Sequence, residues 1–286
     1  MIKEYRDGEM GRLLQEARTC GWDTAFYNYV KTQVERGYAV VEDERIVDWK
    51  YLLPIDVDSV VLVLGCGLGT VPVVLSQTCK KVYATDPRWE NIQFLNIRRK
   101  QQGINNLFPF YTRDLLNLPF PEGSFDLIVL RSSECGLSVQ LGRLIRHFRG
   151  LLKVGGRVSL SLSNRLAFHR LFGKGRRESL TIHTIYGYKR LLRQEGFTDI
   201  QFYAPLPNHN GVPLFCVPVE DRNAVDYFLR NVFPLVETVP AEVKRAHALE
   251  YAVARAGVRL ALRHGLTGLV KLFVPGFNII ARRCKI

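Results

Sequence analysis

Hydrophobic runs alternate with amphipathic stretches over residues 59–203, and this alternation predicts parallel strands joined by helices. Ser59–Leu64 is apolar on both faces, which is typical of a central parallel strand covered by helices. Further strands are expected over 81–85, 107–112, 125–130, 157–162 and 198–203, with helices over 71–77, 88–101, 139–152 and 185–194. The pattern therefore predicts an α/β fold with a doubly wound sheet.

The pattern changes on both sides of this region. Residues 1–50 are rich in charged and aromatic residues, with helical stretches. Residues 205–218 contain four prolines and are expected to form a loop, and a mostly helical segment follows over 221–272. Phe277–Arg282 is expected to be a last strand. We therefore expect an N-terminal helical segment (1–55), a ligand-binding core (56–205 and 273–286) and an insertion (206–272).

A glycine-rich turn joins the first strand to the next helix. Gly65, Gly67 and Gly69 permit a tight turn and let backbone N–H groups approach a ligand. Asp86 ends the second strand, where a carboxylate can accept hydrogen bonds from ribose hydroxyls, cap the next helix, or do both. A nicotinamide dehydrogenase is disfavoured because Thr70 replaces the third glycine of that fingerprint. A P-loop is excluded because no Gly-Lys-Ser/Thr follows.

The chain resembles the class I S-adenosylmethionine-dependent methyltransferases in four segments that occur in that family's order and spacing. These are 61–70 (VLVLGCGLGT), 82–87 (VYATDP), 113–130 (RDLLNLPFPEGSFDLIVL) and 151–162 (LLKVGGRVSLSL). The resemblance implies a Rossmann-like seven-stranded sheet whose last strand lies antiparallel beside the sixth. It also implies that S-adenosylmethionine is the cofactor.

The same resemblance implies roles for single residues. Those expected at the cofactor are Gly65, Cys66, Gly67 and Gly69 at the methionine end, Asp86 at the ribose, Asp114 and Leu115 at the adenine, and Arg131 beside the sulfonium. The residues that follow Arg131 lack the Asn/Asp-Pro-Pro-Tyr/Phe motif of members that methylate exocyclic or amide nitrogens. This difference speaks against methylation of adenine N6 or protein glutamine.

Three further segments give a hint about the substrate. WKYLLP at 49–54, SNR at 163–165 and the helical stretch 186–197 resemble bacterial methyltransferases linked to the assembly of sugars, polysaccharides or specialised metabolites.

Methyl transfer requires mainly that the two reactants be aligned, and a hydroxyl acceptor also benefits from a base. Glu134 and His183 are the candidate bases, since both are expected in loops over the carboxyl edge of the sheet. The candidate acceptor-binding residues are Arg165, Arg170, Tyr186 and His209. Each of these side chains also has a structural interpretation as an exposed loop residue or a packing residue. No cluster of metal ligands is apparent, and no metal is expected.

Charge is distributed unevenly. Residues 1–139 have a net charge of −2, whereas residues 140–286 have a net charge of +15. The asymmetry suggests an anionic partner such as a phosphorylated substrate, nucleic acid or a membrane surface, or else a solvated face. Arginines at 255, 259 and 263 share one face of a helix, so 241–271 is a candidate for peripheral membrane contact or for a cover over the acceptor.

The remaining composition indicates the compartment. Six cysteines occur without a Cys-x-x-Cys pair, and residues 1–18 contain no apolar signal core. No apolar run approaches the length of a membrane span. We therefore expect a cytoplasmic protein.

The leading interpretation is a methyltransferase that acts on oxygen or nitrogen of a small or lipid-linked, anionic acceptor. An RNA methyltransferase is the alternative suggested by the basic half, although no separate RNA-binding module is visible. A non-catalytic cofactor-binding scaffold is a third possibility. The acceptor, the methylated atom and the oligomeric state stay open.

Overall fold

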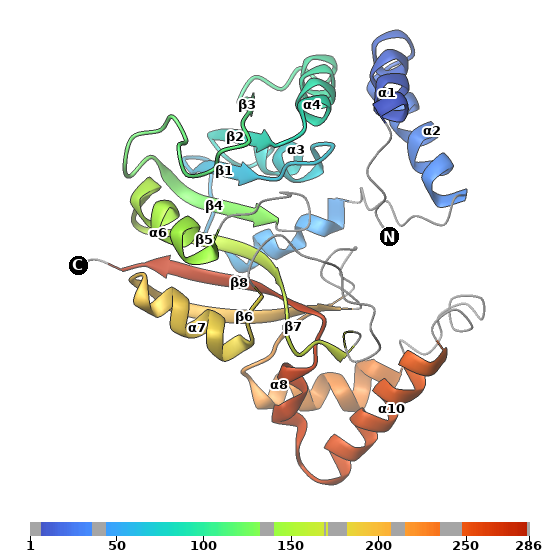
Figure 1. The fold of residues 1–286 in the computed structure, drawn as a ribbon, viewed down its shortest axis with the longest axis vertical. Helices are drawn as coiled ribbons and strands as arrows, with labels where there is room; N and C mark the ends of the chain where they lie inside the picture. The colour runs from blue at the N-terminus through green and yellow to red at the C-terminus, as the bar shows by residue number, and fades with distance from the viewer. Residues whose placement is uncertain are drawn as a thin grey trace.

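The computed structural model describes residues 7–35, 44–131, 140–168, 170, 182–206, 215–234 and 248–284. Its centre is an eight-stranded sheet with the order β3-β2-β1-β4-β5-β8-β6-β7 (Figure 1). The strands are β1 (Val60–Leu64), β2 (Lys81–Asp86), β3 (Leu107–Tyr111), β4 (Phe125–Arg131), β5 (Leu152–Ser163), β6 (Phe197–Leu206), β7 (Phe215–Pro218) and β8 (Gly276–Arg283).

The first five strands are parallel, and β8 lies antiparallel between β5 and β6. Phe277, Ile279 and Ala281 of β8 are fully buried in the apolar cluster on one face of the sheet, and Ile280 is buried in the cluster on the other face. The predicted doubly wound, Rossmann-like sheet with an antiparallel last strand is confirmed.

The predicted number of strands is wrong, because an eighth strand, β7, pairs antiparallel with the end of β6. The sequence suggested a loop over the whole proline-rich stretch. Proline is tolerated at a sheet edge, where its missing N–H costs no ladder hydrogen bond. Buried Val217 adds an apolar contact that holds this edge strand in place.

The fifth strand also begins earlier than expected, at Leu152 instead of residue 157. Gly155 has a φ of 83°, and the pairing with β4 shifts register between Phe125 and Leu127. The Gly155-Gly156 pair therefore permits an irregularity within a continuous strand, whereas the sequence suggested that it separates a helix from a strand.

Helices cover both faces of the sheet. They are α1 (Asp7–Thr19), α2 (Trp22–Glu35), η1 (Glu44–Leu52), α3 (Thr70–Ser76), α4 (Trp89–Gln101), α6 (Leu141–Leu151), α7 (Ile185–Gln194), α8 (Arg222–Tyr227), η3 (Phe228–Val232), α10 (Ala248–Arg263) and η5 (Thr267–Leu272). Residues of α6 and α7 share one apolar cluster with Leu62 and Leu64. Residues of η1, α3 and α4 share another with Val61 and Val63. Opposite faces of β1 thus point into two separate core layers.

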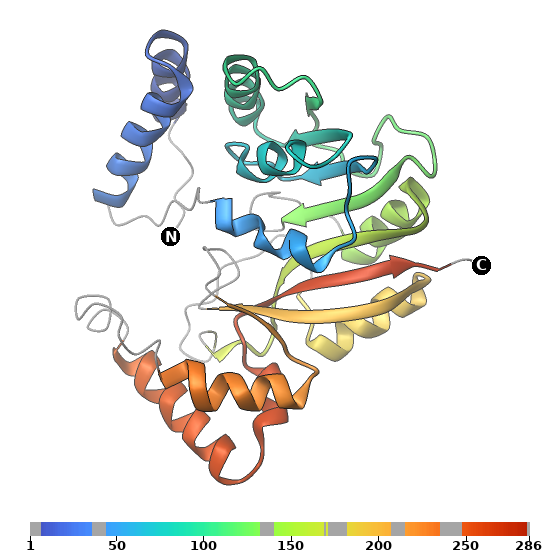
Figure 2. The same cartoon turned by 180° about the vertical axis from the view of Figure 1, so that it is seen from behind.

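The N-terminal helices and the insertion lie toward the same side of the molecule. Met10 and Leu13 of α1 pack with Phe94 of α4 and with Leu68 of the glycine-rich turn. The elements α8 to η5 gather beyond the β6–β7 edge (Figure 1). The arrowheads of β1 and β4 point toward the side on which α2 and α10 lie, and the view from behind agrees (Figure 2). Among the described residues, no helix has the length and hydropathy of a membrane span.

Candidate cofactor and acceptor site

The glycine-rich turn has a backbone that only glycine adopts without strain. Gly65, Gly67 and Gly69 have φ angles of 77°, 54° and 98°, all in the left-handed region. A Cβ on Gly69 would lie 2.5 Å from Cδ1 of Leu95. The N–H groups of Gly65 and Cys66 both donate to the Thr85 carbonyl, at 2.9 and 3.0 Å. The turn is therefore fixed against the end of β2.

Asp86 connects this turn to the start of α4. Its side chain is 1% exposed. Oδ2 accepts a hydrogen bond from the Gly67 N–H at 2.9 Å, and Oδ1 accepts from the Arg88 N–H and from Asn91 Nδ2, both at 3.0 Å. The carboxylate thus lies against the glycine turn, where the prediction places the ribose. Sequence reasoning missed Asn91, since nothing in its spacing from Asp86 marks it as a partner.

Asp114 and Leu115, the predicted adenine neighbours, differ in exposure. Asp114 is exposed, and its carboxylate accepts hydrogen bonds from Asn117 Nδ2 at 2.5 Å and from the Leu116 N–H at 2.9 Å. These bonds, the one from Asn117 first, lower the pKa of Asp114, so the group is ionised at neutral pH. Leu115 is buried in the larger core cluster. Their contact with adenine stays a prediction.

Arg131 ends β4, the strand next to β1, and its side chain is buried. It lies opposite Ser161 of β5 in the register. It is therefore one strand away from the glycine turn, or about 5 Å in the plane of the sheet. The two other predicted loop residues, Glu134 and His209, lie outside the described residues.

His183 lies at the carboxyl edge of β5, two residues before α7. Its carbonyl accepts a hydrogen bond from the Arg165 N–H at 3.1 Å. Its ring packs edge-on against Tyr188, with the centroids 5.3 Å apart. Burial, followed by the charge of Arg165, lowers the pKa of the imidazole. His183 is therefore neutral at pH 7 and has a nitrogen able to accept a proton.

Asn164 is a structural residue whose role sequence reasoning missed. It is 1% exposed, and its Nδ2 donates to the Leu272 carbonyl at 2.8 Å and the Val274 carbonyl at 2.9 Å. Its own N–H donates to the Pro275 carbonyl at 3.1 Å. Asn164 thus fastens the end of β5 to the chain that enters β8. Its only sequence signal is its place in the SNR segment.

The other predicted acceptor residues lie around this junction. Arg165 is exposed, and Arg170 lies two residues beyond Phe168, whose N–H donates to the Phe273 carbonyl at 3.0 Å. Tyr186 is 60% exposed on α7, with Lys271 Nζ 5.6 Å from its ring centroid. The fold therefore brings Arg165, Arg170 and His183 to the edge of β5, and it places Tyr186 on an outer surface.

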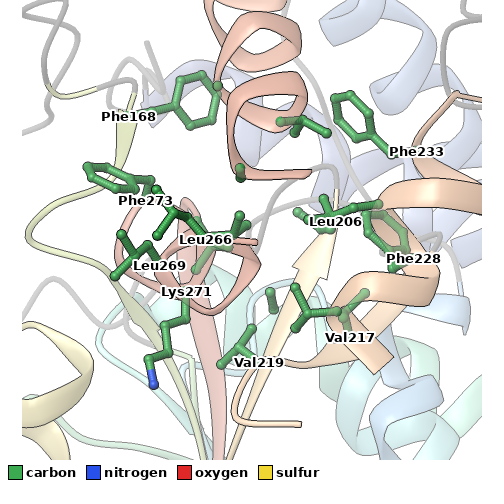
Figure 3. Close-up of a pocket in the computed structure, with 18 of the residues that line it drawn as sticks. Phe168, Leu206, Val217, Val219, Phe228, Phe233, Leu266, Leu269, Lys271 and Phe273 are labelled. Carbon is green, nitrogen blue, oxygen red and sulfur yellow. The ribbon is translucent and has the colours of Figure 1, made fainter. Parts of the chain in front are cut away.

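A cavity of about 420 Å³ lies beneath α10 and was not foreseen from the sequence (Figure 3). Its walls come from β6 and β7, from η3, from α10, and from the segment that joins η5 to β8. Every described lining residue except Lys271 is nonpolar, and the Lys271 amine points away from the interior in Figure 3. The amphipathic pattern of α10 indicated a cover over the acceptor but not a hollow beneath the helix.

Two phenylalanines of the basic region 140–195 are not presented for stacking. Phe148 is fully buried in the core, and Phe168 lines the cavity. Arg146 forms a two-point pair with the Glu195 carboxylate, at 2.9 and 2.8 Å. Among the described residues, no group of three or more His, Cys, Asp or Glu is placed to hold a metal ion.

Comparisons with known proteins identify the domain and the fold. The model of a methyltransferase domain family matches residues 62–160. The chain is similar in structure to YcgJ of Bacillus subtilis, at 13% identity and a TM-score of 0.51, covering 85% of this chain and 99% of that one. It is also similar to phosphoethanolamine N-methyltransferase 2 of Haemonchus contortus in complex with phosphomonomethylethanolamine and S-adenosylhomocysteine. That match has 14% identity and a TM-score of 0.54, and covers 94% of this chain and 59% of that one.

A third solved structure has the same fold. The [4+2]-cyclase SpnF has 17% identity and a TM-score of 0.50, with coverage of 84% of this chain and 80% of that one. No curated protein matches the sequence. At such identities, the solved structures establish the shared fold.

Proposed function

We propose that this protein is an S-adenosylmethionine-dependent methyltransferase that methylates an oxygen or nitrogen atom of a small or lipid-linked anionic acceptor. The matched methyltransferase domain and the shared fold support the predicted family and cofactor. The observation that best supports the proposed acceptor is the position of Arg165 beside His183 at the edge of β5, with Arg170 five residues further along the chain.

The glycine turn fits the cofactor. Its backbone is fixed in the left-handed region at Gly65, Gly67 and Gly69, and a side chain at Gly69 would meet Leu95. We assign the methionine end to this turn and the ribose to Asp86. When bound, the cofactor supplies a methyl group on a sulfonium, which is already activated for displacement. The protein then mainly has to hold the acceptor in line, which alone can contribute roughly 7–11 kcal/mol.

His183 is the base that we assign among the described residues. Its lowered pKa keeps the imidazole neutral at pH 7, so it can accept the proton that an acceptor hydroxyl or ammonium group loses. The edge-on contact with Tyr188 fixes the plane of the ring. β5 is two strands from β1, so His183 lies about 10 Å along the edge from the glycine turn. An acceptor bound between these two points would meet both.

Arg165 and Arg170 are assigned to the negative charge of the acceptor. Arginine suits this task because its guanidinium pairs with phosphate or carboxylate through two parallel hydrogen bonds. The Haemonchus contortus neighbour, with its phosphomonomethylethanolamine, is a precedent on this fold for a small phosphorylated acceptor. Phe148 of the basic region is buried, so its ring is not available for stacking on RNA bases.

The flanking segments are assigned a covering role. The N-terminal segment 1–55 contacts the glycine turn through Leu68, and the insertion 206–272 contacts the end of β5 through the bonds of Asn164. α2 and α10 both lie on the side to which the arrowheads of β1 and β4 point (Figures 1 and 2). We propose that the two segments together exclude water from the transfer.

Transfer of a labelled methyl group tests this function. Purified protein is incubated with labelled S-adenosylmethionine and phosphorylated amines, phosphorylated alcohols or RNA. We expect label in an anionic small or lipid-linked acceptor, with a KM that rises with salt because exposed charges are screened over about 10 Å at 0.1 M. Label in RNA alone would refute the proposed acceptor, and cofactor binding without any transfer would indicate a scaffold.

A further inference from the structure

We propose that the cavity beneath α10 binds the hydrocarbon chain of an amphiphilic acceptor, so that the acceptor is a lipid-linked anion. This inference rests on the proposed function and deepens it. The cavity volume of about 420 Å³ lies within the usual range for ligand sites, roughly 300–1,000 Å³. A nonpolar cavity does not hold water well and takes up hydrocarbon instead. A polar ligand would have no hydrogen-bonding partner among the described wall residues except Lys271 at the rim.

The helix above the cavity is packed loosely enough to admit such a chain. None of the described side chains of α10 is buried, and Val258 and Leu262 contact the small apolar cluster of the insertion only from its margin. Leu260 also lines the cavity and is 58% exposed. A chain beneath α10 would bury apolar surface that water now contacts, so it would complete the packing of this helix.

The position of the cavity connects it to the transfer site. Val274 and Pro275 line it and immediately precede β8, whose Gly276 lies opposite Ser163 at the carboxyl end of β5. Part of the cavity wall therefore lies at the same sheet edge as the glycine turn. β6, which contributes Ala204, lies three strands from β4, a distance of about 14 Å. One amphiphilic acceptor can span this distance, with its head group near β4 and its hydrocarbon chain beneath α10.

The charges around the cavity match an anionic head group. Phe168 forms part of the wall, and Arg165 and Arg170 lie on either side of it in the chain. Lys271 lies at the rim, with its amine directed outward (Figure 3). A negatively charged head would therefore lie beside Arg165 and Arg170 while the chain stays in the nonpolar interior. Neither an unsubstituted phosphate nor an uncharged hydrocarbon would use both parts of this arrangement.

Gly257 offers a way to fill the cavity with little risk to the fold. It lies within α10 and lines the cavity, and a Cβ there would meet no heavy atom within 4 Å. Gly257→Phe places a ring in this open space, whereas Gly257→Ala adds only a methyl group. Both changes remove the same glycine from a helix interior, so the alanine variant is the matched control. Thermal unfolding then shows whether either variant is damaged.

The test is calorimetric binding of butyl, octyl and dodecyl phosphate, below their micelle concentrations, to the full chain. Each buried methylene should tighten binding about threefold to fourfold, so burial of only two of the extra methylenes would already make dodecyl phosphate bind about tenfold more tightly than butyl phosphate. Gly257→Ala should preserve this preference, and Gly257→Phe should abolish it without changing the affinity for S-adenosylmethionine.

Equal affinities for the three chain lengths would overturn the proposal. So would a preference for long chains that survives in a folded Gly257→Phe variant, because the chain would then lie on the exposed face of α10 or on a membrane surface. The two proposals fail separately. Methyl transfer that does not depend on the chain length of the acceptor would support the proposed function and refute the proposed role of the cavity. Chain-dependent binding without methyl transfer would support the role of the cavity and refute the proposed function.

Discussion

The glycine turn and the cavity beneath α10 lie at the same edge of the sheet but are built in opposite ways. Around the turn, Asp86 is buried and its carboxylate holds Gly67, Arg88 and Asn91 together. Around the cavity, the described residues of α10 are exposed or half-buried, and the wall is almost entirely nonpolar. One region is preorganised by hydrogen bonds, and the other leaves space for a ligand to fill.

The difference matches what each region is proposed to recognise. A nucleoside cofactor presents hydrogen-bonding groups in fixed directions, so a rigid polar site binds it well. A hydrocarbon chain has no such groups and needs only apolar volume. The cofactor region should therefore respond sharply to small changes, whereas the insertion should tolerate them, and the following predictions test this contrast from the largest expected effect to the smallest.

Asp86→Ala should have the largest effect. The change leaves three donors without their buried acceptor, and hydrogen bonds to charged groups each contribute about 1.5–3 kcal/mol. We expect the free energy of unfolding to fall by at least about 3 kcal/mol, and cofactor affinity to fall at least tenfold. Urea denaturation and calorimetry measure the two effects. Asp114→Ala is the control, since that carboxylate is exposed, and it should lower the free energy of unfolding by less than Asp86→Ala does. Wild-type unfolding of Asp86→Ala would contradict the assigned rigidity.

His183→Gln should lower kcat by about 10²–10⁴-fold, the usual contribution of a general base. The pKa of His183 is lowered, so the imidazole charges only below its ordinary pKa of about 6.5. The wild-type rate should therefore rise with pH through a value below 6.5 and then stay level, and the variant should lose this acid limb. His264→Gln, at an exposed position just after α10, is the control. An unchanged pH profile in His183→Gln would exclude the base.

Arg165→Ala and Arg170→Ala should raise the KM for an anionic acceptor about tenfold, which corresponds to the loss of one hydrogen bond to a charged group. Cofactor affinity should stay the same, because the change concerns the acceptor alone. Arg143→Ala, on an exposed position of α6, removes the same charge and should leave KM unchanged. An equal rise of KM in all three variants would indicate a general effect of net charge and contradict the assignment of Arg165 and Arg170 to the acceptor.

The smallest expected effect is on stability, when glycine is replaced by alanine in α10 and in the core strand β5. Gly257→Ala lies in α10 with open space around the new Cβ, so it should raise the free energy of unfolding by about 0.5–1 kcal/mol. Gly156→Ala lies in β5, where the Cβ would be 2.9 Å from the Lys153 carbonyl oxygen, so it should lower that energy. Urea denaturation of both variants shows whether the free energy of unfolding rises or falls. The same sign in both would contradict the contrast between a tight core and a loose insertion.

The sequence predicted most of the cofactor region because its signals are local. The apolar run before Gly65 and the glycine spacing specify a strand, a turn and a helix within a few residues. The hydrogen bonds of Asp86 and Asn164 join residues that are distant in sequence or that no sequence pattern marks. They could therefore be identified only from the structure. Asn164 reaches Leu272 across 108 positions. β7 was missed because its prolines indicate a loop, whereas its pairing with β6 decides the outcome.

The cavity also could not be predicted from periodicity. The pattern of α10 shows which residues share a face, but a hollow depends on how far the helix stands from β6, β7 and η5. The same pattern would result if Val258 and Leu262 were fully packed. Only the three-dimensional arrangement shows that both are half-buried and that Val258 lines an open volume.

The most direct test of the account is to follow a labelled methyl group from S-adenosylmethionine into a cell extract and then to partition the products between organic solvent and water. The wild type and Gly257→Ala should place the label in an acidic product that enters the organic phase. Gly257→Phe should place little or none there, although it still binds the cofactor. Label that stays in the water phase or precipitates with RNA, to the same extent in all three proteins, would contradict a lipid-linked acceptor seated beneath α10.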